Sequence, residues 1–297
     1  MPAIAAELNR LPYSLSNLDP ESYFAKSADR VDVAKMKAEL HRRLPGAAGP
    51  TTQPDSKAGQ GRVIFANLLK SLPFAAAFDR KTGPLLFPSG STPEQVASFG
   101  RTPRSALEVF AEATSQIVIT DYRTDEDFIV ELKTESQRDV MLLAKIPAES
   151  TMQATIDKVL KRAAAPNPLH ERFALEYREE LLIPKLSFNI LKSYDELIPV
   201  EIVNSAFSKS GNREYIIKAE QATAFVLNER GAELEAIVEI GSTGDFGDDG
   251  PPPPPPPPIR KFHFDRPFLV LLRETQSHEP YFAVWLENAE LMEPFPK

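Results

Sequence analysis

The stretch that decides the fold is Ala222-Thr-Ala-Phe-Val-Leu-Asn-Glu-Arg-Gly-Ala-Glu233, in which an apolar run is followed by polar residues and Gly231. The run belongs to a longer apolar segment, 215–228, with Thr223, Phe225 and Leu227 on one face. Side chains at every second residue of a strand share a face. We therefore predict one long strand that ends just before Glu229.

Within residues 229–240 the pattern alternates after Gly231, with Glu233, Glu235 and Glu239 on one face together with Ile237. This pattern predicts a second strand with one face fit for burial, formed by Ala232, Leu234, Ala236 and Val238. Residues 241–250, Gly-Ser-Thr-Gly-Asp-Phe-Gly-Asp-Asp-Gly, have the composition of an acidic loop. Taken alone, the segment indicates an ordinary β-hairpin with a loop at its tip.

The rest of the chain predicts an α+β protein with large mixed and antiparallel sheets. Short helices are predicted at 32–44, 105–113 and 155–164. Strands are predicted at 62–67, 115–122, 127–132, 139–146, 181–191, 262–272 and 281–286, the last two as a hairpin. The apolar run 139–146 is too continuous for a surface strand, so we expect it to be buried on both faces.

Composition excludes several classes of protein. The 297 residues contain no cysteine, so no disulfide framework, thiolate zinc site or cysteine nucleophile can form. The formal net charge of −8 and the lack of a basic stripe argue against a nucleic-acid partner. We find no apolar stretch long enough to span a membrane and no signal peptide, and we draw no conclusion about compartment.

Catalytic and metal-binding patterns are absent from the sequence. We find no nucleophile elbow, Walker loop, dinucleotide fingerprint or zinc-protease motif. The four histidines, at positions 41, 170, 263 and 278, have no partner at metal-ligand spacing and are interpreted as surface or edge residues. We therefore expect no enzyme, no cofactor and no metal.

Five segments, in order along the chain, resemble the serpin family of protease inhibitors. The most specific is the 222–233 strand and turn, which is similar to the family's strand running into Asn-Glu-x-Gly-x-Glu at the hinge of its reactive-centre loop. The other resembling segments are 63–67 with Pro73-Phe-Ala-Ala-Ala-Phe-Asp79, 183–197, 262–273 with Phe-x-x-Asp-x-Pro-Phe-Leu, and 281–288. Each is weak alone, and together they favour a serpin-type fold from about residue 62 to the C-terminus.

The resemblance implies a mechanism. In serpins an exposed loop is bait for a serine or cysteine protease, and after cleavage it enters a large sheet as an additional strand. It assigns a hinge to Glu229, Gly231, Ala232, Leu234, Ala236 and Val238. The family counts fourteen residues from the hinge glycine to the bait position, which makes Asp245–Phe246 the candidate scissile bond.

Three departures from the family pattern keep a second interpretation open. Leu234 stands where the family prefers a small residue, and 67–74 lacks the family's Phe-Lys-Gly-x-Trp pattern. The resemblance also implies a chain shortened at its N-terminus, because only about 60 residues precede Arg62. We therefore divide the chain into 1–61, a short helical segment with a linker, and 62–297, a serpin-like domain whose hinge, loop and proline run occupy 229–261. The alternative to an inhibitor is a non-inhibitory binding or scaffold protein.

Eight consecutive prolines, Pro251 to Pro258, follow the candidate bait. Such a run forms a stiff polyproline II helix of about 25 Å, at ~3.1 Å per residue. It is interpreted either as a rigid spacer or as a ligand for a polyproline-binding domain with an aromatic-lined groove, with Arg260 and Lys261 beside it to supply charge.

Overall fold

The structure is a computed structural model, and it describes residues 23–29, 33–43, 61–68, 72–79, 83–102, 114–165, 173–203, 209–232, 259–277 and 280–296. The chain forms two compact units. Unit 1 takes its residues from 1–70 and 189–224, and unit 2 from 71–188 and 225–297. These units do not follow the predicted division of the chain at residues 61 and 62, which rests on composition and family resemblance and stays a prediction.

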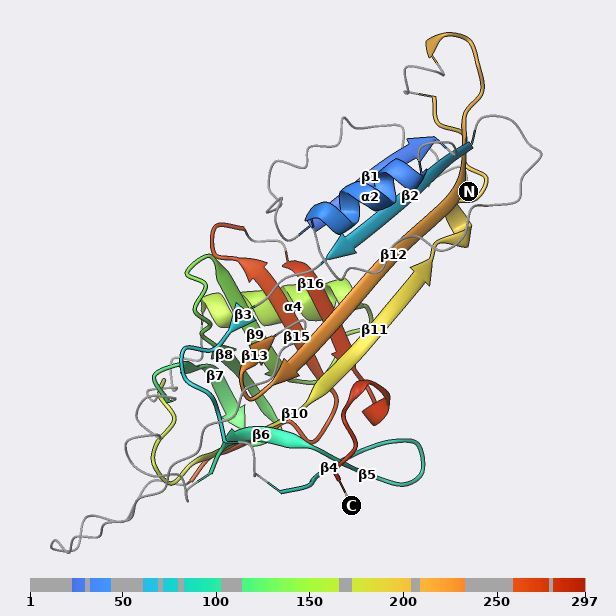
Figure 1. Cartoon of the computed structure of the whole chain (residues 1–297). Coiled ribbons are helices and arrows are strands. Elements are labelled where there is room, and N and C mark those ends of the chain that lie inside the picture. The colour runs from blue at the N-terminus through green and yellow to red at the C-terminus, as the bar shows by residue number, and fades with distance from the viewer. Residues whose placement is uncertain are drawn as a thin grey trace, which may run out of the picture. The chain divides into compact units, whose positions relative to one another are not determined.

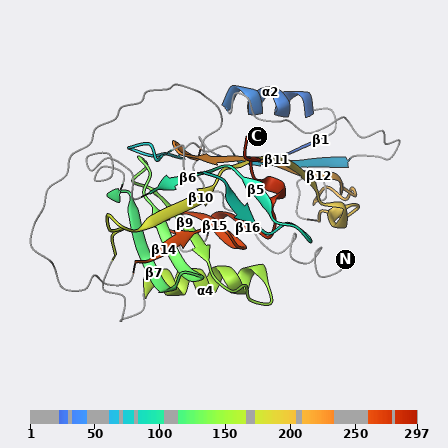
Figure 2. The same ribbon diagram turned by 90° about the horizontal axis from the view of Figure 1, so that it is seen from below.

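Unit 1 is a sheet covered by one helix. Strands β1 (Tyr23–Asp29) and β2 (Gly61–Leu68) pair antiparallel, and β2 pairs in parallel with β12 (Tyr215–Asn228) from Tyr215↔Gly61 to Thr223↔Leu68. Helix α2 (Val33–Arg43) lies on one face of this sheet (Figure 2). Its apolar stripe of Val33, Met36 and Leu40 packs on Val63, Phe65 and Ala222, as the helical spacing of these residues requires. The opposite face carries a smaller cluster around Val200, Ile216 and Ala219.

Unit 2 contains a five-stranded antiparallel sheet in the order β16-β15-β9-β8-β7 (Figure 1). The strands are β7 (Ile117–Thr124), β8 (Asp127–Leu132), β9 (Asp139–Lys145), β15 (Phe268–Glu274) and β16 (Pro280–Leu286). Helix α4 (Met152–Ala164), capped by Thr151, packs on one face through Ile156 and Val159. Every residue of β9 is buried, which confirms the prediction from its continuous apolar run.

A three-stranded sheet, β14-β10-β6, packs on the other side of the main core of unit 2. It is built from β6 (Ser98–Arg101), β10 (Glu180–Pro184) and β14 (Lys261–His263), and β10 runs parallel to β14. The core joins it to the five-stranded sheet through a phenylalanine cluster of Phe87, Phe128, Phe262, Phe264 and Phe268. The remaining elements of the described chain are β3 (Leu72–Pro73), β4 (Leu85–Phe87), β5 (Glu94–Val96), β11 (Leu186–Ser193), β13 (Gly231–Ala232) and the 3-10 turns Asp195–Leu197 and Ala289–Leu291.

The predicted α+β class is confirmed, and two predicted strands are corrected. The run 181–191 is two strands because Pro184 has no N–H to continue the ladder, and β11 pairs with β12 in another sheet. In β11 only the first residue, Leu186, is buried. The run 262–272 is likewise interrupted before Pro267 and gives β14 and β15. The predicted helix at 105–113 lies outside the described residues.

Candidate functional site

The long strand β12 ends in a tight turn of four residues, Asn228 to Gly231. The side-chain oxygen Oδ1 of Asn228 accepts a hydrogen bond from the backbone N–H of Arg230 at 2.8 Å, as asparagine does in many turns. Gly231 has φ +130°, a conformation that L side chains rarely adopt. The Asn-Glu-Arg-Gly sequence is therefore the physical reason why the chain reverses here.

After the turn the chain enters a sheet. The two residues of β13 pair antiparallel with β12 (Leu227↔Ala232, Asn228↔Gly231) and antiparallel with β3 (Gly231↔Pro73, Ala232↔Leu72). Strand β13 thus lies between two strands from its first residue. Ala232 is only 2% exposed, and a Cβ at position 231 would collide with the Leu72 carbonyl oxygen. Only small side chains fit at this point.

Backbone and ionic contacts fix the turn to its surroundings. The backbone N–H groups of Phe74 and Phe78 donate to the carbonyl oxygens of Arg230 and Glu229, at 2.7 and 2.8 Å. The buried Glu229 carboxylate forms an ion pair with Lys185, 2.6 Å from Nζ to Oε2. Lys185 directly follows β10, so the turn is tied to one end of that strand.

Downstream of the candidate loop, the chain is held at the other end of β10. Arg260 is 3% exposed, and its guanidinium forms a two-point ion pair with Glu179, at 2.6 and 2.8 Å. The interpretation that Arg260 could supply charge to a partner's polyproline-binding groove is therefore wrong, because this guanidinium is already paired inside unit 2. Lys261 is exposed.

Of the predicted hinge residues, the structure describes Glu229, Gly231 and Ala232, and it brings all three together at the end of β12. The other predicted site residues lie outside the described residues: Leu234, Ala236, Val238, the candidate scissile pair Asp245 and Phe246, and the run from Pro251 to Pro258. Their roles stay predictions.

The sequence analysis did not single out Lys185 and Glu179, and it gave Arg260 a different role from the one that the structure shows. Lys185 lies within a resembling segment, and the charges of Arg178-Glu-Glu180 directly precede a buried strand. A charge at the edge of a buried strand usually has a partner, and this signal could have drawn attention to these residues. It could not have named the partner.

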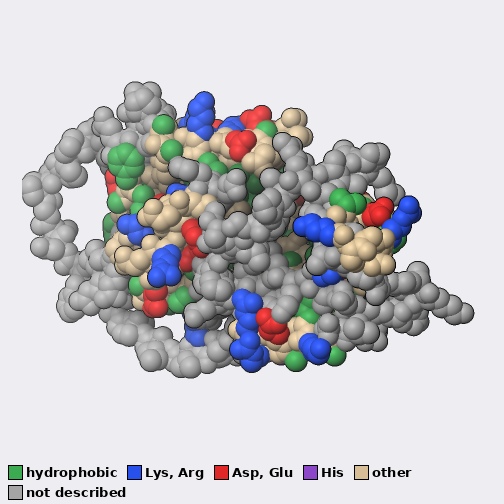
Figure 3. Space-filling view, turned by 90° about the horizontal axis from the view of Figure 1, so that it is seen from above, with side chains coloured by type: hydrophobic (Ala, Val, Ile, Leu, Met, Phe, Trp, Pro, Cys, Tyr) green, Lys and Arg blue, Asp and Glu red, His purple; other side chains and the backbone are tan. Residues whose placement is uncertain are grey.

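Three further observations concern other kinds of site. The described part of the chain contains no group of three or more His, Asp or Glu side chains that could hold a metal ion. Among the described helices none is long and apolar enough to cross a membrane. On the face shown in Figure 3, Lys and Arg side chains of the described residues lie among Asp and Glu side chains.

No protein-family model matches the chain, and no curated protein sequence matches it significantly. Solved structures do match, and they define the class: the chain has the serpin fold. This confirms the predicted fold.

Three of the solved structures to which the chain is similar come from three different organisms. Serpin48 of the insect Tenebrio molitor, described as highly specific, has a TM-score of 0.55 at 14% identity over 92% of this chain and 78% of its own. A serpin from Schistosoma mansoni has 0.54 at 14% identity, over 88% and 64%. Human thyroxine-binding globulin in complex with thyroxine has 0.57 at 13% identity, over 98% and 79%.

Proposed function

We propose that the protein is a serpin-type protease inhibitor that presents the segment after Ala232 as bait to a serine or cysteine protease. The observation that carries the proposal is the position of β13, which already lies antiparallel between β12 and β3. A strand that begins between two neighbours can lengthen by adding residues to the same ladder. Cleavage of the segment would free it to do so.

The register of β13 supports Asp245 as the bait position. Ala232 lies opposite Leu227, so each further residue of the segment would lie opposite the preceding residue of β12. Continued without a bulge, this ladder would bring residue 244 opposite Tyr215, the first residue of the 14-residue β12. Asp245 is then the first residue for which β12 offers no partner. The family count of fourteen from the hinge glycine reaches the same residue.

The same register gives Leu234 an environment. Leu234 would lie opposite Phe225, and residues directly opposite each other in an antiparallel pair share a face. Phe225 is 6% exposed and stacks on Phe282 with 4.7 Å between ring centroids. A leucine there would join an apolar cluster, so we expect Leu234 to slow insertion by overpacking, at about 1–3 kcal/mol, rather than to forbid it.

Insertion would also have to displace an existing neighbour of β12. Within unit 1, β2 pairs with β12 along eight residues, and β11 is the other partner of β12. Because a strand has only two edges, a lengthening β13 must separate one of these strands from β12. Strand β3 follows β2 in the chain and already pairs with β13, so we infer that β2 is the strand displaced.

The direct test is an SDS-resistant complex with a protease. Proteases that cut after aspartate or after phenylalanine are incubated with the full chain, and complex and cleaved chain are measured by electrophoresis and mass spectrometry. Ala236→Arg places a charge on the inward face predicted for the strand, and Glu235→Arg places the same charge on the outward face. The proposal predicts complex with wild type and Glu235→Arg but only cleaved chain with Ala236→Arg. Cleavage without complex in all three would reject inhibition.

A second candidate function is a non-inhibitory binding or scaffold protein. One protein of similar fold is named for binding thyroxine, and the Pro251 to Pro258 run offers a ligand for a polyproline-binding domain. With Arg260 sequestered, recognition would rest on the prolines and on Lys261. This function predicts that an isolated polyproline-binding domain captures the wild-type chain but not a variant with the eight prolines replaced by Gly-Ser repeats. Under both proposals the protein is not an enzyme.

A further inference from the structure

The described residues stop at Ala232 and resume at Ile259. The residue after Ile259, Arg260, is already buried. Ile259 is 44% exposed, and Arg260, the next residue, is 3% exposed. A charged side chain at such a boundary needs partners, because burial of an unpaired guanidinium is strongly unfavourable. The partners of Arg260 therefore show what holds this end of the segment.

Arg260 is held on three sides. Its Nε and Nη2 donate to the two carboxylate oxygens of Glu179, and Nη2 also donates to the carbonyl oxygen of Ala174 at 3.0 Å. Its guanidinium carbon lies 5.5 and 5.2 Å from the ring centroids of Tyr122 and Phe262. A two-point arginine–carboxylate pair fixes orientation as well as position, and stacking on rings restricts the remaining freedom.

The carboxylate that holds Arg260 is itself fixed. Glu179 is 1% exposed, and its Oε2 accepts a hydrogen bond from the backbone N–H of Glu176 at 3.0 Å. The next residue along, Lys261, donates its backbone N–H to Asp125 at 3.0 Å, and the same Asp125 oxygen accepts from the Tyr122 hydroxyl at 2.8 Å. Burial, and to a lesser extent the hydrogen bond to Asp125, raises the pKa of Tyr122. The hydroxyl therefore stays protonated and remains a hydrogen-bond donor.

These side-chain contacts stabilise β14, a strand with few backbone hydrogen bonds. β14 has three residues, forms the edge of its sheet, and pairs only with β10 among the described residues. Three parallel pairs give few hydrogen bonds, so the backbone alone would hold the strand poorly. His263, at the far end of β14, adds a 2.8 Å contact with Glu180.

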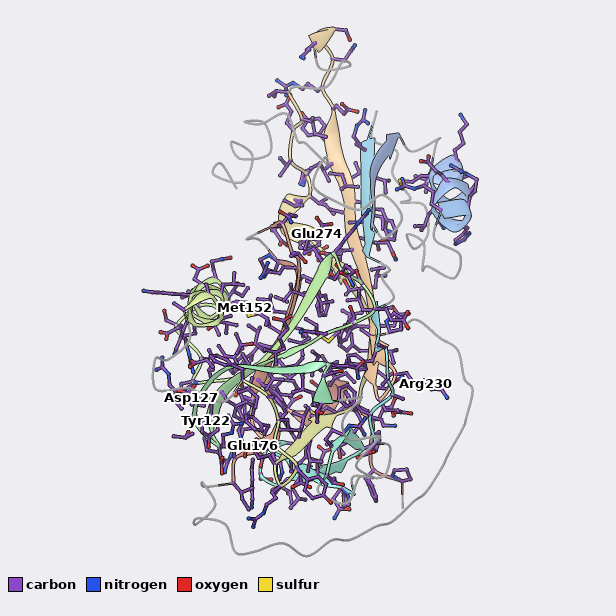
Figure 4. The ribbon with its side chains drawn as sticks, turned by 90° about the vertical axis from the view of Figure 1, so that its left-hand side faces the viewer. Tyr122, Asp127, Met152, Glu176, Arg230 and Glu274 are labelled. Atoms are coloured by element: carbon purple, nitrogen blue, oxygen red, sulfur yellow. The ribbon has the colours of Figure 1, made fainter. Side chains whose placement is uncertain are left out.

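The two ends of the segment are held at separate places. In Figure 4, Arg230 lies on the opposite side of unit 2 from Tyr122 and Glu176. Glu179 precedes β10 and Lys185 follows it, so about 20 Å of strand, at ~3.3 Å per residue, separates the two points of attachment.

We propose that Arg260, clamped by Glu179, is a positioning residue that fixes the chain at the start of β14, on the C-terminal side of the candidate bait loop. The functional role of this fixed end rests on the proposed function, because a bait loop must keep a defined position when a protease binds it. The clamp itself does not depend on inhibition.

The test uses the bonds that the clamp protects. Trypsin cleaves after arginine and lysine, and the bonds after Arg260 and Lys261 lie beside the buried pair. In Glu179→Gln the guanidinium loses its charged partner and can leave with the segment. We expect tryptic cleavage at these two bonds, followed by mass spectrometry well below the melting temperature, to become at least about tenfold faster. Glu149→Gln, which changes an exposed ion pair with Lys158, is the matched control and should leave this rate unchanged.

The cleavage rate at each separate tryptic site distinguishes a positioning role of Arg260 from a general loss of stability. The proposal expects the acceleration at 260–261 to exceed that at every other tryptic site, with an intermediate rate in Arg260→Lys, which keeps the charge but loses the two-point geometry. An unchanged rate at these bonds would overturn the proposal, and so would an acceleration of the same size at all tryptic sites. If Glu179→Gln fails to fold, Arg260→Lys provides the same comparison. No target protease is involved, so failure of the clamp and failure of inhibition are separate results.

Discussion

The chain on the two sides of the 233–258 segment is held by residues that flank the same strand, β10, but in different ways. At the Gly231 end a backbone turn and a two-residue strand do most of the holding, and the ion pair joins Glu229 to Lys185, a side chain that is 18% exposed. At the Arg260 end both charges are almost completely buried and are joined at two points. In the first arrangement a two-residue strand lies between two longer partners along which it can lengthen, and in the second a buried ion pair holds the chain at the start of a three-residue edge strand. The difference indicates that the Gly231 end can change conformation, whereas the Arg260 end keeps its position.

The largest effect is expected at the fixed end. Arg260→Met removes the cation and leaves the Glu179 carboxylate buried without its partner, which should lower the free energy of unfolding by about 3–5 kcal/mol. Arg266→Met is the control, because that arginine is 64% exposed and its pair with Glu126 is 3.6 Å long. We expect it to change stability by less than about 0.5 kcal/mol in urea unfolding. Equal effects of the two substitutions would contradict a buried clamp.

The second largest effect on stability is expected at the turn that contains Gly231. Gly231→Ala combines a φ of +130° with a collision against the Leu72 backbone, and we expect a loss of about 3 kcal/mol. Gly90→Ala is a matched control with a positive φ of +57° and open space around the added carbon. It should cost only about 1 kcal/mol. Thermal unfolding of both variants separates the collision from the conformational strain, and similar losses would mean that β13 is not tightly flanked.

The ion pair at the moving end should matter less than the one at the fixed end. Lys185→Met leaves Glu229 without its cation, but Glu229 can turn toward solvent more easily than Glu179, so we expect a loss of about 1–2 kcal/mol. Lys158→Met removes an exposed pair with Glu149 and should cost less than about 0.5 kcal/mol. A loss at Lys185 as large as that at Arg260 would remove the contrast between the two ends.

The smallest expected effect is a change of stability with pH that is caused by Glu131. Burial raises the pKa of Glu131 in β8, so the folded state holds this proton more tightly than the unfolded state. Below the unfolded pKa of about 4.3 there is no penalty, and stability falls as the pH rises from there through the folded value. Glu131→Gln should remove this slope and be more stable than wild type at pH 7, as measured by urea unfolding from pH 4 to 8. A lower stability of the variant at pH 7 would contradict the assignment.

Local pattern was enough to predict most strands, and it failed where prolines divide them. The burial of β9 and the length of β12 followed from apolar periodicity. The breaks at Pro184 and Pro267 were missed because apolar residues lie on both sides of each proline, and the switch to another sheet depends on distant partners. The Asn228–Gly231 turn was predictable from its own residues. The pairing of Arg260 with Glu179 joins residues 81 positions apart, and no local pattern contains it.

Under the proposed function, cleavage lets the segment after Ala232 lengthen β13 along β12. The most direct measurement is the melting temperature of the full chain before and after limited proteolysis between residues 241 and 250. Because up to 12 residues, 233–244, would be added to the two residues of β13, we predict a rise of roughly 10 °C or more after cleavage. Ala236→Arg should lose the rise and Glu235→Arg should keep it. An unchanged or lower melting temperature of the cleaved wild-type protein would contradict strand insertion.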